Sequence, residues 1–295
     1  MKEHLKVKEF MVLTLGGVPI FHYSPSGSRK LDELLSGFLT AISSFASEFG
    51  ERSVQGLSFE GSEIMYDHAD SEALFIFLVD VGAPKKILRA ILRDLRKKFM
   101  SEFKNELAID IPIVEVFMGF RTEVIRAFKH YEGILAITSN LSPYVILDVD
   151  KEVLALAVES EGLLDEFHRD FGSAGTRILE AIDGEATMAQ VSTSQGLEVE
   201  EVSEIIEYLV IWGVVKIYKL HPILKKDDAR FDAFLDIIGL PKKDYQLLGR
   251  TRSLCNGNLS IIEISERVGV TAERLNDVFS KLGDQVKWKH IEVIG

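Results

Sequence analysis

The chain has 295 residues, of which 46% are hydrophobic and 27% charged, with a net charge of −12 at pH 7, so it holds material for two or three globular domains. Its single cysteine, Cys255, excludes an internal disulfide and a cysteine-rich zinc site, and none of its seven histidines has a second one at the i, i+4 spacing of a helical metal site. No apolar run reaches the roughly 18 residues of a transmembrane helix, and the N-terminus lacks the apolar segment of a secretory signal, so we expect a cytoplasmic protein without metal or cofactor.

The first 118 residues read as alternating strands and helices. Apolar residues 10–15 and 20–23 flank a turn at 16–19, which predicts a β-hairpin. Residues 31–49 repeat apolar side chains at the i, i+3, i+4 spacing of a helix with one buried face. Three short strands are then expected, over 54–59, 63–67 and 73–81. The last of them is apolar almost throughout, as in a central strand that is covered on both sides.

The next helix opens at Pro84, a position where proline is favoured. One side of this helix is an apolar stripe. The other side carries seven basic residues: Lys85, Lys86, Arg89, Arg93, Arg96, Lys97 and Lys98. Such a charged side is either a solvated face or a surface for an acidic partner or for anionic lipid head groups.

The element order of this part, two strands, helix, three strands and helix, resembles the longin and roadblock-like family of small α/β domains. Residues 16–23 (GGVPIFHY) are similar to the first hairpin of longin domains, and residues 8–118 have the length of one. The resemblance implies a five-stranded antiparallel sheet with helices over residues 1–118. It also implies a platform for dimerisation, with a second copy or with a longin or roadblock protein, and a docking site for a small GTPase.

Residues 119–170 are expected to form a connecting segment with partial secondary structure. A helix over 122–131, a strand over 144–148 and a second helix over 153–167 fit the pattern of apolar residues. The apolar content favours packed structure over a free linker, and no low-complexity tract interrupts it.

The segment that follows has the outline of a winged helix. A helix ends at residues 183–184 (Asp-Gly), a helix–turn–helix follows over 188–211, and a β-rich end begins at about residue 213. The pattern therefore predicts one winged helix over residues 171–220.

The same pattern recurs further along the chain. A shift of 73 residues places Gly184 on Gly257 and Gly196 on Gly269, with the apolar positions between them in register. We therefore predict a second winged-helix-like domain over residues 221–295, in tandem with the first.

Two stretches of the first module, ILEAIDG (178–184) and LVIWGVV (209–215), resemble the winged-helix region of the nitrogen-permease-regulator-like proteins. These are paired subunits of a eukaryotic complex that switches off Rag-type GTPases. That family also begins with a longin domain and continues into further winged-helix-like modules, so the resemblance follows the order of nearly the whole chain. It implies a distant prokaryotic or archaeal relative that binds a Ras-like (Rag-like) small GTPase, as an activating protein or as its non-catalytic relative.

In the GTPase-activating member of that family, an arginine in the loop before the last central strand enters the GTPase site. Aligned on the strand at 73–77, that arginine falls at about Ser71. The GTPase-facing loop then contains Asp67, His68, Asp70, Ser71 and Glu72. A serine does not supply the cation that stabilises phosphoryl transfer, so we expect no catalytic residue in this loop. The alternative interpretation of the loop is a solvated hairpin connection. The candidates left for such a cation are Arg52 and Arg121.

The acidic charge weakens a DNA-binding interpretation of the winged helices, because a DNA-binding surface has to neutralise phosphates. The helix expected at 199–211 carries no lysine or arginine, and the second module has one close pair of arginines, Arg250 and Arg252. The acidic residues at and after the start of that helix are Glu198, Glu200, Glu201, Glu204 and Glu207. Nucleic acid is therefore not an expected partner.

The sequence contains neither a phosphate-binding loop of the form Gly-x-x-x-x-Gly-Lys-Ser/Thr nor a Gly-x-Ser-x-Gly nucleophile elbow. We therefore expect a regulatory and scaffold protein that binds a Ras-like small GTPase, with GTPase activation of the partner as its one candidate activity. The alternative is a winged-helix transcription regulator with an N-terminal sensing or dimerisation domain.

Overall fold

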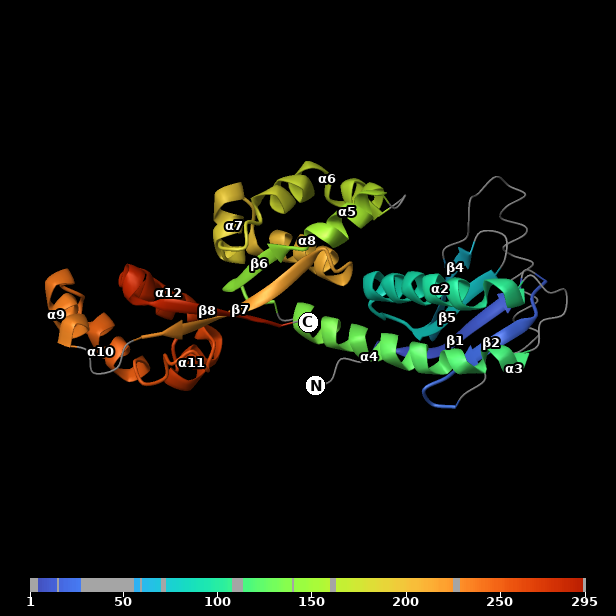
Figure 1. The fold of residues 1–295 in the computed structure, drawn as a ribbon, viewed down its shortest axis with the longest axis horizontal. Helices are drawn as coiled ribbons and strands as arrows, with labels where there is room; N and C mark the ends of the chain where they lie inside the picture. Colours follow the sequence, from blue (N-terminus) through green and yellow to red (C-terminus); the bar gives the residue numbers. More distant parts are fainter. Residues whose placement is uncertain are drawn as a thin grey trace. The chain divides into compact units, whose positions relative to one another are not determined.

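The chain forms two compact units, Met1–Ser139 and Asn140–Gly295, both of which are drawn in Figure 1. The computed structural model describes residues 5–14, 16–27, 56–58, 60–69, 73–107, 114–139, 141–159, 163–224 and 229–293. In the described residues, the first unit is built on a five-stranded sheet, and the second combines helices with a three-stranded sheet.

A mixed α/β arrangement with an antiparallel sheet defines the first unit. Its strands are β1 (Val7–Thr14), β2 (Pro19–Tyr23), β3 (Gly56–Ser58), β4 (Ser62–Ala69) and β5 (Ala73–Asp80). They pair antiparallel throughout, in the order β2-β1-β5-β4-β3. The predicted five-stranded antiparallel sheet is confirmed, and β5 is buried from Ala73 to Val79, as predicted for a central strand.

The predicted hairpin at the start of the chain is also confirmed, because β1 pairs with β2. Its turn is closed by the N–H of Gly17, which donates to the carbonyl oxygen of Thr14 at 2.9 Å. Gly17 has a φ of 79°, in the left-handed region that costs glycine little. The hydroxyl of Thr14 adds a further bond by accepting the N–H of Val18 at 3.1 Å.

One face of the sheet is covered by helix α2 (Lys85–Leu107). Its predicted apolar stripe is buried, and Phe99 of the stripe contacts Phe75 of β5 with ring centroids 5.5 Å apart. The opposite face carries a second buried cluster of Met11, Leu13, Ile64, Tyr66, Leu74, Ile76 and Leu78. This alternation follows from the two-residue period of a strand. The helix predicted over 31–49 lies outside the described residues.

The chain next forms α3 (Val114–Phe117), a 3₁₀ turn η1 (Met118–Phe120) and α4 (Arg121–Thr138). The sequence predicts a connecting segment over residues 119–170, whereas α4 belongs to the first compact unit. The reason is the packing of Phe128, whose ring lies 5.6 Å from that of Tyr23 in β2 and 5.8 Å from that of Phe77 in β5. Helices α2 and α4 therefore cover the same face of the sheet.

The second unit contains helices and one small sheet. Its first part consists of β6 (Val145–Val149), α5 (Lys151–Glu159), α6 (Leu163–Ala181), α7 (Met188–Gln195), α8 (Val199–Ile211) and β7 (Val215–Ile223). Its second part consists of α9 (Ala229–Ile238), α10 (Lys242–Thr251), α11 (Ile261–Val268), α12 (Ala272–Ser280), η2 (Gly283–Gln285) and β8 (Lys287–Glu292). Helix α6 is interrupted at Gly172, which has a φ of 53°.

Strand β7 joins the two parts of this unit. The sheet order is β6-β7-β8, and both pairings are antiparallel. The first half of β7 pairs with β6, from Val215 opposite Val149, and its second half pairs with β8, as far as Ile223 opposite Lys287. One continuous strand therefore supplies the sheet partner for both parts.

The 73-residue repeat is visible in the helix caps. The side chain of Thr187 caps α7 in a capping box with Gln190, and Ser260 caps α11 in the same way with Glu263. Both eight-residue helices end at a left-handed glycine, at the two positions that the shift superposes. The identification of these repeats as winged helices remains a prediction.

Candidate functional surfaces

The residues of the predicted GTPase-facing loop do not all belong to a loop. Asp67 and His68 lie in β4, opposite Phe75 and Leu74 of β5, because the antiparallel pairing continues as far as Ala69. The remaining members, Asp70, Ser71 and Glu72, lie outside the described residues, as does Arg52. The connection between the two strands is therefore shorter than the sequence indicates.

The carboxylate of Asp67 has a partner on the helix that covers the sheet. Arg96 of α2 places its Nε 3.1 Å from Asp67 Oδ2. Both side chains are partly buried, so the ion pair links β4 to α2. Asp67 thus stabilises the packing of the first unit and does not extend from a loop toward a partner.

Arg121 is the first residue of α4, and its side chain is exposed. Its guanidinium carbon lies 5.3 Å from the ring centroid of Tyr23, a cation–π contact. Tyr23 belongs to β2, which is separated from β4 by β1 and β5, so about 14 Å of sheet lies between the two strands. The structure does not bring Arg121 next to Asp67.

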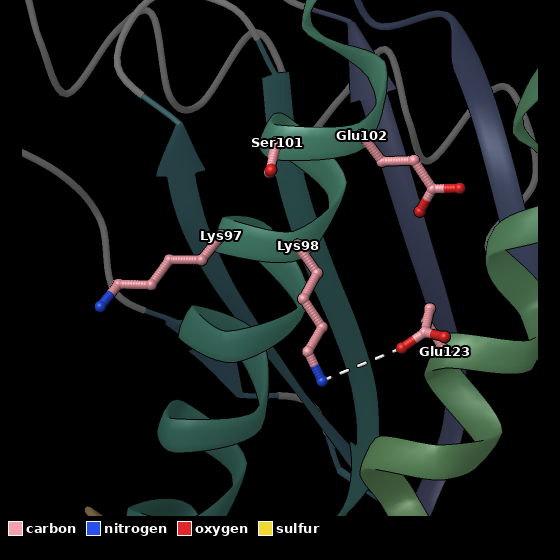
Figure 2. A pocket seen from close by; sticks show the side chains of 5 residues that line it. All are labelled: Lys97, Lys98, Ser101, Glu102 and Glu123. Atoms are coloured by element: carbon pink, nitrogen blue, oxygen red, sulfur yellow. Dashed lines mark ion pairs between the residues drawn. The ribbon is translucent and has the colours of Figure 1, made fainter. Parts of the chain in front are cut away.

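A hollow of about 380 Å³ opens between α2 and α4. It is lined by Lys97, Lys98, Ser101, Glu102 and Glu123, and Figure 2 shows Lys98 directed toward Glu123 of the neighbouring helix. Lys98 Nζ lies 3.3 Å from Asp94 Oδ2 and 4.0 Å from Glu123 Oε2. The lining holds no nucleophile paired with a base, so it offers charged groups for binding and no chemistry.

Sequence reasoning missed this hollow. Lys97 and Ser101 are one helical turn apart, as are Lys98 and Glu102. The spacing therefore predicts that these side chains of α2 lie close together. The sequence does not predict that Glu123 lines the hollow, because its position depends on the packing of α4 beside α2. Among the residues that the structure describes, no group of three or more His, Cys, Asp or Glu side chains is placed to hold a metal ion.

The acidic side chains at and after the start of helix α8 lie on a face in contact with solvent, as the sequence predicts. Its apolar residues are buried, whereas Glu198, Glu200, Glu201 and Glu204 are exposed or partly exposed and Glu207 is partly exposed. A duplex placed against this side of α8 would meet carboxylates along its phosphates, which is electrostatically unfavourable.

In the second part of that unit, several basic side chains have partners within the chain. Arg252 donates to the Asp232 carboxylate at 2.7 Å, and Arg250 donates to the carbonyl oxygen of Val268. The carboxylate of Asp244 is 2% exposed and accepts hydrogen bonds from Arg274 and, at 3.1 Å, from Lys281. Burial raises the pKa of Asp244, but the bonds from Lys281 and Arg274 outweigh it, so the pKa lies below its ordinary value.

These ion pairs tie α12 to α10 and leave fewer cations directed at solvent. Asp277 on the exposed side of α12 also contacts Arg274 at 2.8 Å and Lys281 at 2.9 Å. The basic residues at and after α12 therefore serve the packing of the helix. Arg250 and Arg252, for which the sequence favours surface placement without a role, also bond to groups of the same chain.

Comparison with known proteins finds no matching family model and no matching curated protein. Among solved structures, the gliding protein MglB from Thermus thermophilus shares 19% identity, with 35% of this chain and 78% of that chain covered and a TM-score of 0.26. A second structure, described as MglB with a tetrameric arrangement, shares 18% identity over 35% and 77%, also with a TM-score of 0.26. A TM-score this low does not establish a shared fold.

Proposed function

We propose that this chain is a regulatory or scaffold protein whose first unit is a longin-like domain that binds a Ras-like small GTPase. The observation that carries the proposal is the sheet: a β1–β2 hairpin, strands β3 to β5 and then α2, antiparallel in the order β2-β1-β5-β4-β3. These strands and α2 follow the element order on which the resemblance to longin domains rests, and the helix expected over 31–49 lies outside the described residues. In the family, such a domain pairs with a second longin or roadblock protein or with itself.

The proposed role is binding with little acceleration of hydrolysis. The sequence has no arginine between residues 67 and 72, and Arg121 lies over the ring of Tyr23. Without a cation in the GTPase site, what remains is positioning of the GTPase's own residues, which lowers a barrier less than an arginine does.

We expect the chain to bind a Ras-like GTPase of its host, with an acceleration of single-turnover GTP hydrolysis far below the ~10³–10⁵ that an inserted arginine supplies. Arg121→Ala is expected to leave the rate unchanged, and Ser71→Arg is expected to raise it. Arg126→Ala is the matched control, because Arg126 is an exposed arginine of the same helix that pairs with Glu123.

A large acceleration that Arg52→Ala or Arg121→Ala abolishes would show that an arginine of this chain enters the GTPase site. Failure to bind any Ras-like GTPase in a pull-down from native lysate, followed by titration of purified candidates, would overturn the proposed function itself.

A second function, transcription regulation through the two repeats, is favoured by their capped helix–turn–helix segments. The exposed carboxylates of α8 oppose it, and we expect no saturable binding of duplex DNA below micromolar concentration at about 0.1 M salt, where charges are only partly screened. Fluorescence anisotropy of a labelled duplex measures this. Submicromolar affinity with a steep salt dependence would favour the regulator over the GTPase-binding protein.

A further inference from the structure

The outward sides of α2 and α4 form one basic surface in an acidic chain. The two helices lie side by side on the sheet, and Lys98 and Glu123 meet across them (Figure 2). The exposed cations of this surface are Lys85, Lys86, Arg89, Lys97, Lys104, Arg121, Arg126 and Lys129. Helix α2 has 23 residues, so they extend over about 35 Å.

The positive charge remains when every neighbouring acid is counted. Helices α2, α3 and α4 and strand β4 together contain eleven lysines and arginines against eight aspartates and glutamates, a surplus of three positive charges. That count includes the acids of the ion pairs Lys85–Glu63 and Arg96–Asp67. The whole chain has a net charge of −12, so this part differs in sign from the whole.

Some of these cations occupy positions where their charge is unfavourable for the helix itself. Arg89, Arg93 and Lys97 follow one another at i, i+4 spacing, where like charges repel each other. Two lysines also occupy the first turn of α2, which contains no acidic residue, although the helix dipole favours negative charge there.

Bulky apolar side chains are exposed within the same layer. Met118 is 67% exposed and Ile125 is 47% exposed, in η1 and α4 respectively, and Val116 of α3 is also exposed. Their segment is fixed against α2, because Phe117 and Phe120 pack on Phe99 with centroids 5.5 Å and 5.0 Å apart. Exposed cations and exposed apolar groups on adjacent helices are the two features with which peripheral proteins bind membranes.

We propose that the outward surface of α2, η1 and α4 binds an anionic phospholipid bilayer. The cations interact with the head groups, and Met118 and Ile125 enter the boundary between head groups and acyl chains. An acidic protein partner explains the cations but leaves the exposed methionine and isoleucine without a role, so the lipid surface fits better. No described helix is long and apolar enough to cross a membrane, so the contact is peripheral.

The acidity of the whole chain does not prevent this contact. At physiological ionic strength, charges are screened over about 8 Å, so a bilayer responds mainly to the side chains nearest to it. Each lysine or arginine close to an anionic surface strengthens binding about fivefold. A surplus of three charges over these elements, together with burial of Met118 and Ile125, is then expected to give measurable binding.

The test is flotation of the full-length protein with vesicles of phosphatidylcholine containing about 30% phosphatidylserine, at about 0.1 M salt. Wild type is expected to float with these vesicles and not with phosphatidylcholine alone. The triple variant Lys97→Glu, Lys104→Glu, Lys129→Glu is expected to bind about a hundredfold more weakly. Met118→Gln with Ile125→Gln is expected to weaken binding while its salt dependence persists.

The matched control is Lys242→Glu, Lys243→Glu, Arg267→Glu, which changes the net charge by the same amount at exposed positions of the second unit. It is expected to float like wild type, and circular dichroism confirms that each variant is folded. Equal loss in the control, or no preference of wild type for anionic vesicles, would overturn the proposal. So would binding to soluble polyglutamate without binding to vesicles, which would assign the surface to an acidic protein. The readout needs no GTPase, so it is independent of the proposed function.

Discussion

Replacing Phe99 with alanine is expected to lower the free energy of unfolding of the first unit by about 3–5 kcal/mol. The side chain is fully buried at the centre of the layer between α2 and the sheet. Its ring contacts four other phenylalanines within 5.5 Å between centroids: Phe75, Phe103, Phe117 and Phe120. Removing it leaves a cavity that these rings cannot close without leaving their own positions.

Urea denaturation with two probes measures the effect. Both tryptophans, Trp212 and Trp288, lie in the second unit, so their fluorescence reports that unit, whereas far-ultraviolet circular dichroism reports both. Phe99→Ala is expected to shift the dichroism transition to lower urea and to leave the fluorescence transition in place. Phe99→Leu is the control, with a smaller loss because it leaves less empty volume. A loss below about 1 kcal/mol in the alanine variant would contradict the central packing of this ring.

Much of this layer is predictable from local sequence. The i, i+3, i+4 spacing of α2 marks Phe99 and Phe103 as core residues, and both are buried. The unbroken apolar run of β5 likewise predicts a strand covered on both faces, which the structure has. These signals succeed because burial of one face of a regular element imposes its own period on the sequence.

The predictions that failed depend on contacts between distant residues. The sequence ends the strand at Asp67 and starts the loop there, but the antiparallel pairing of β4 continues to Ala69, and the carboxylate of Asp67 pairs with Arg96 of α2. Helix α4 reads as part of a connector because its own apolar periodicity is modest, and only the contacts of Phe128 with β2 and β5 attach it to the first unit.

The buried Asp244 shows the same limit in the second unit. Its partners Arg274 and Lys281 follow 30 and 37 residues later, so nothing in the sequence around it indicates a buried carboxylate. By contrast, the caps of α7 and α11 can be predicted from the sequence, because Thr187 and Ser260 form hydrogen bonds with side chains three residues further along the chain. Short-range hydrogen bonds leave a local signature in the sequence, and long-range ion pairs do not.

The second large effect is expected at Cys255, whose reaction with a thiol reagent in the native protein should be at least ~10³-fold slower than that of free cysteine at pH 8. Burial raises the pKa of this thiol to about 12, against an ordinary value near 8.5, so the reactive thiolate is scarce. The side chain is fully buried in the core of the second unit, and its backbone carbonyl accepts the N–H of Leu224 at 2.9 Å. At the equivalent position of the first repeat the chain has Ile182, so the thiol occupies an apolar position.

Because the chain has one cysteine, the absorbance released by a disulfide reagent reports this site alone. The native rate is expected to be set by opening of the second unit, and urea should restore the rate of free cysteine. Leu248→Ala, which removes a buried side chain from the same core, should therefore speed the native reaction, whereas Phe99→Ala in the first unit should leave it unchanged. A native thiol that reacts as fast as free cysteine would show that Cys255 is not enclosed in a core. A reaction that Phe99→Ala accelerates as strongly as Leu248→Ala would show that the second unit does not open independently of the first.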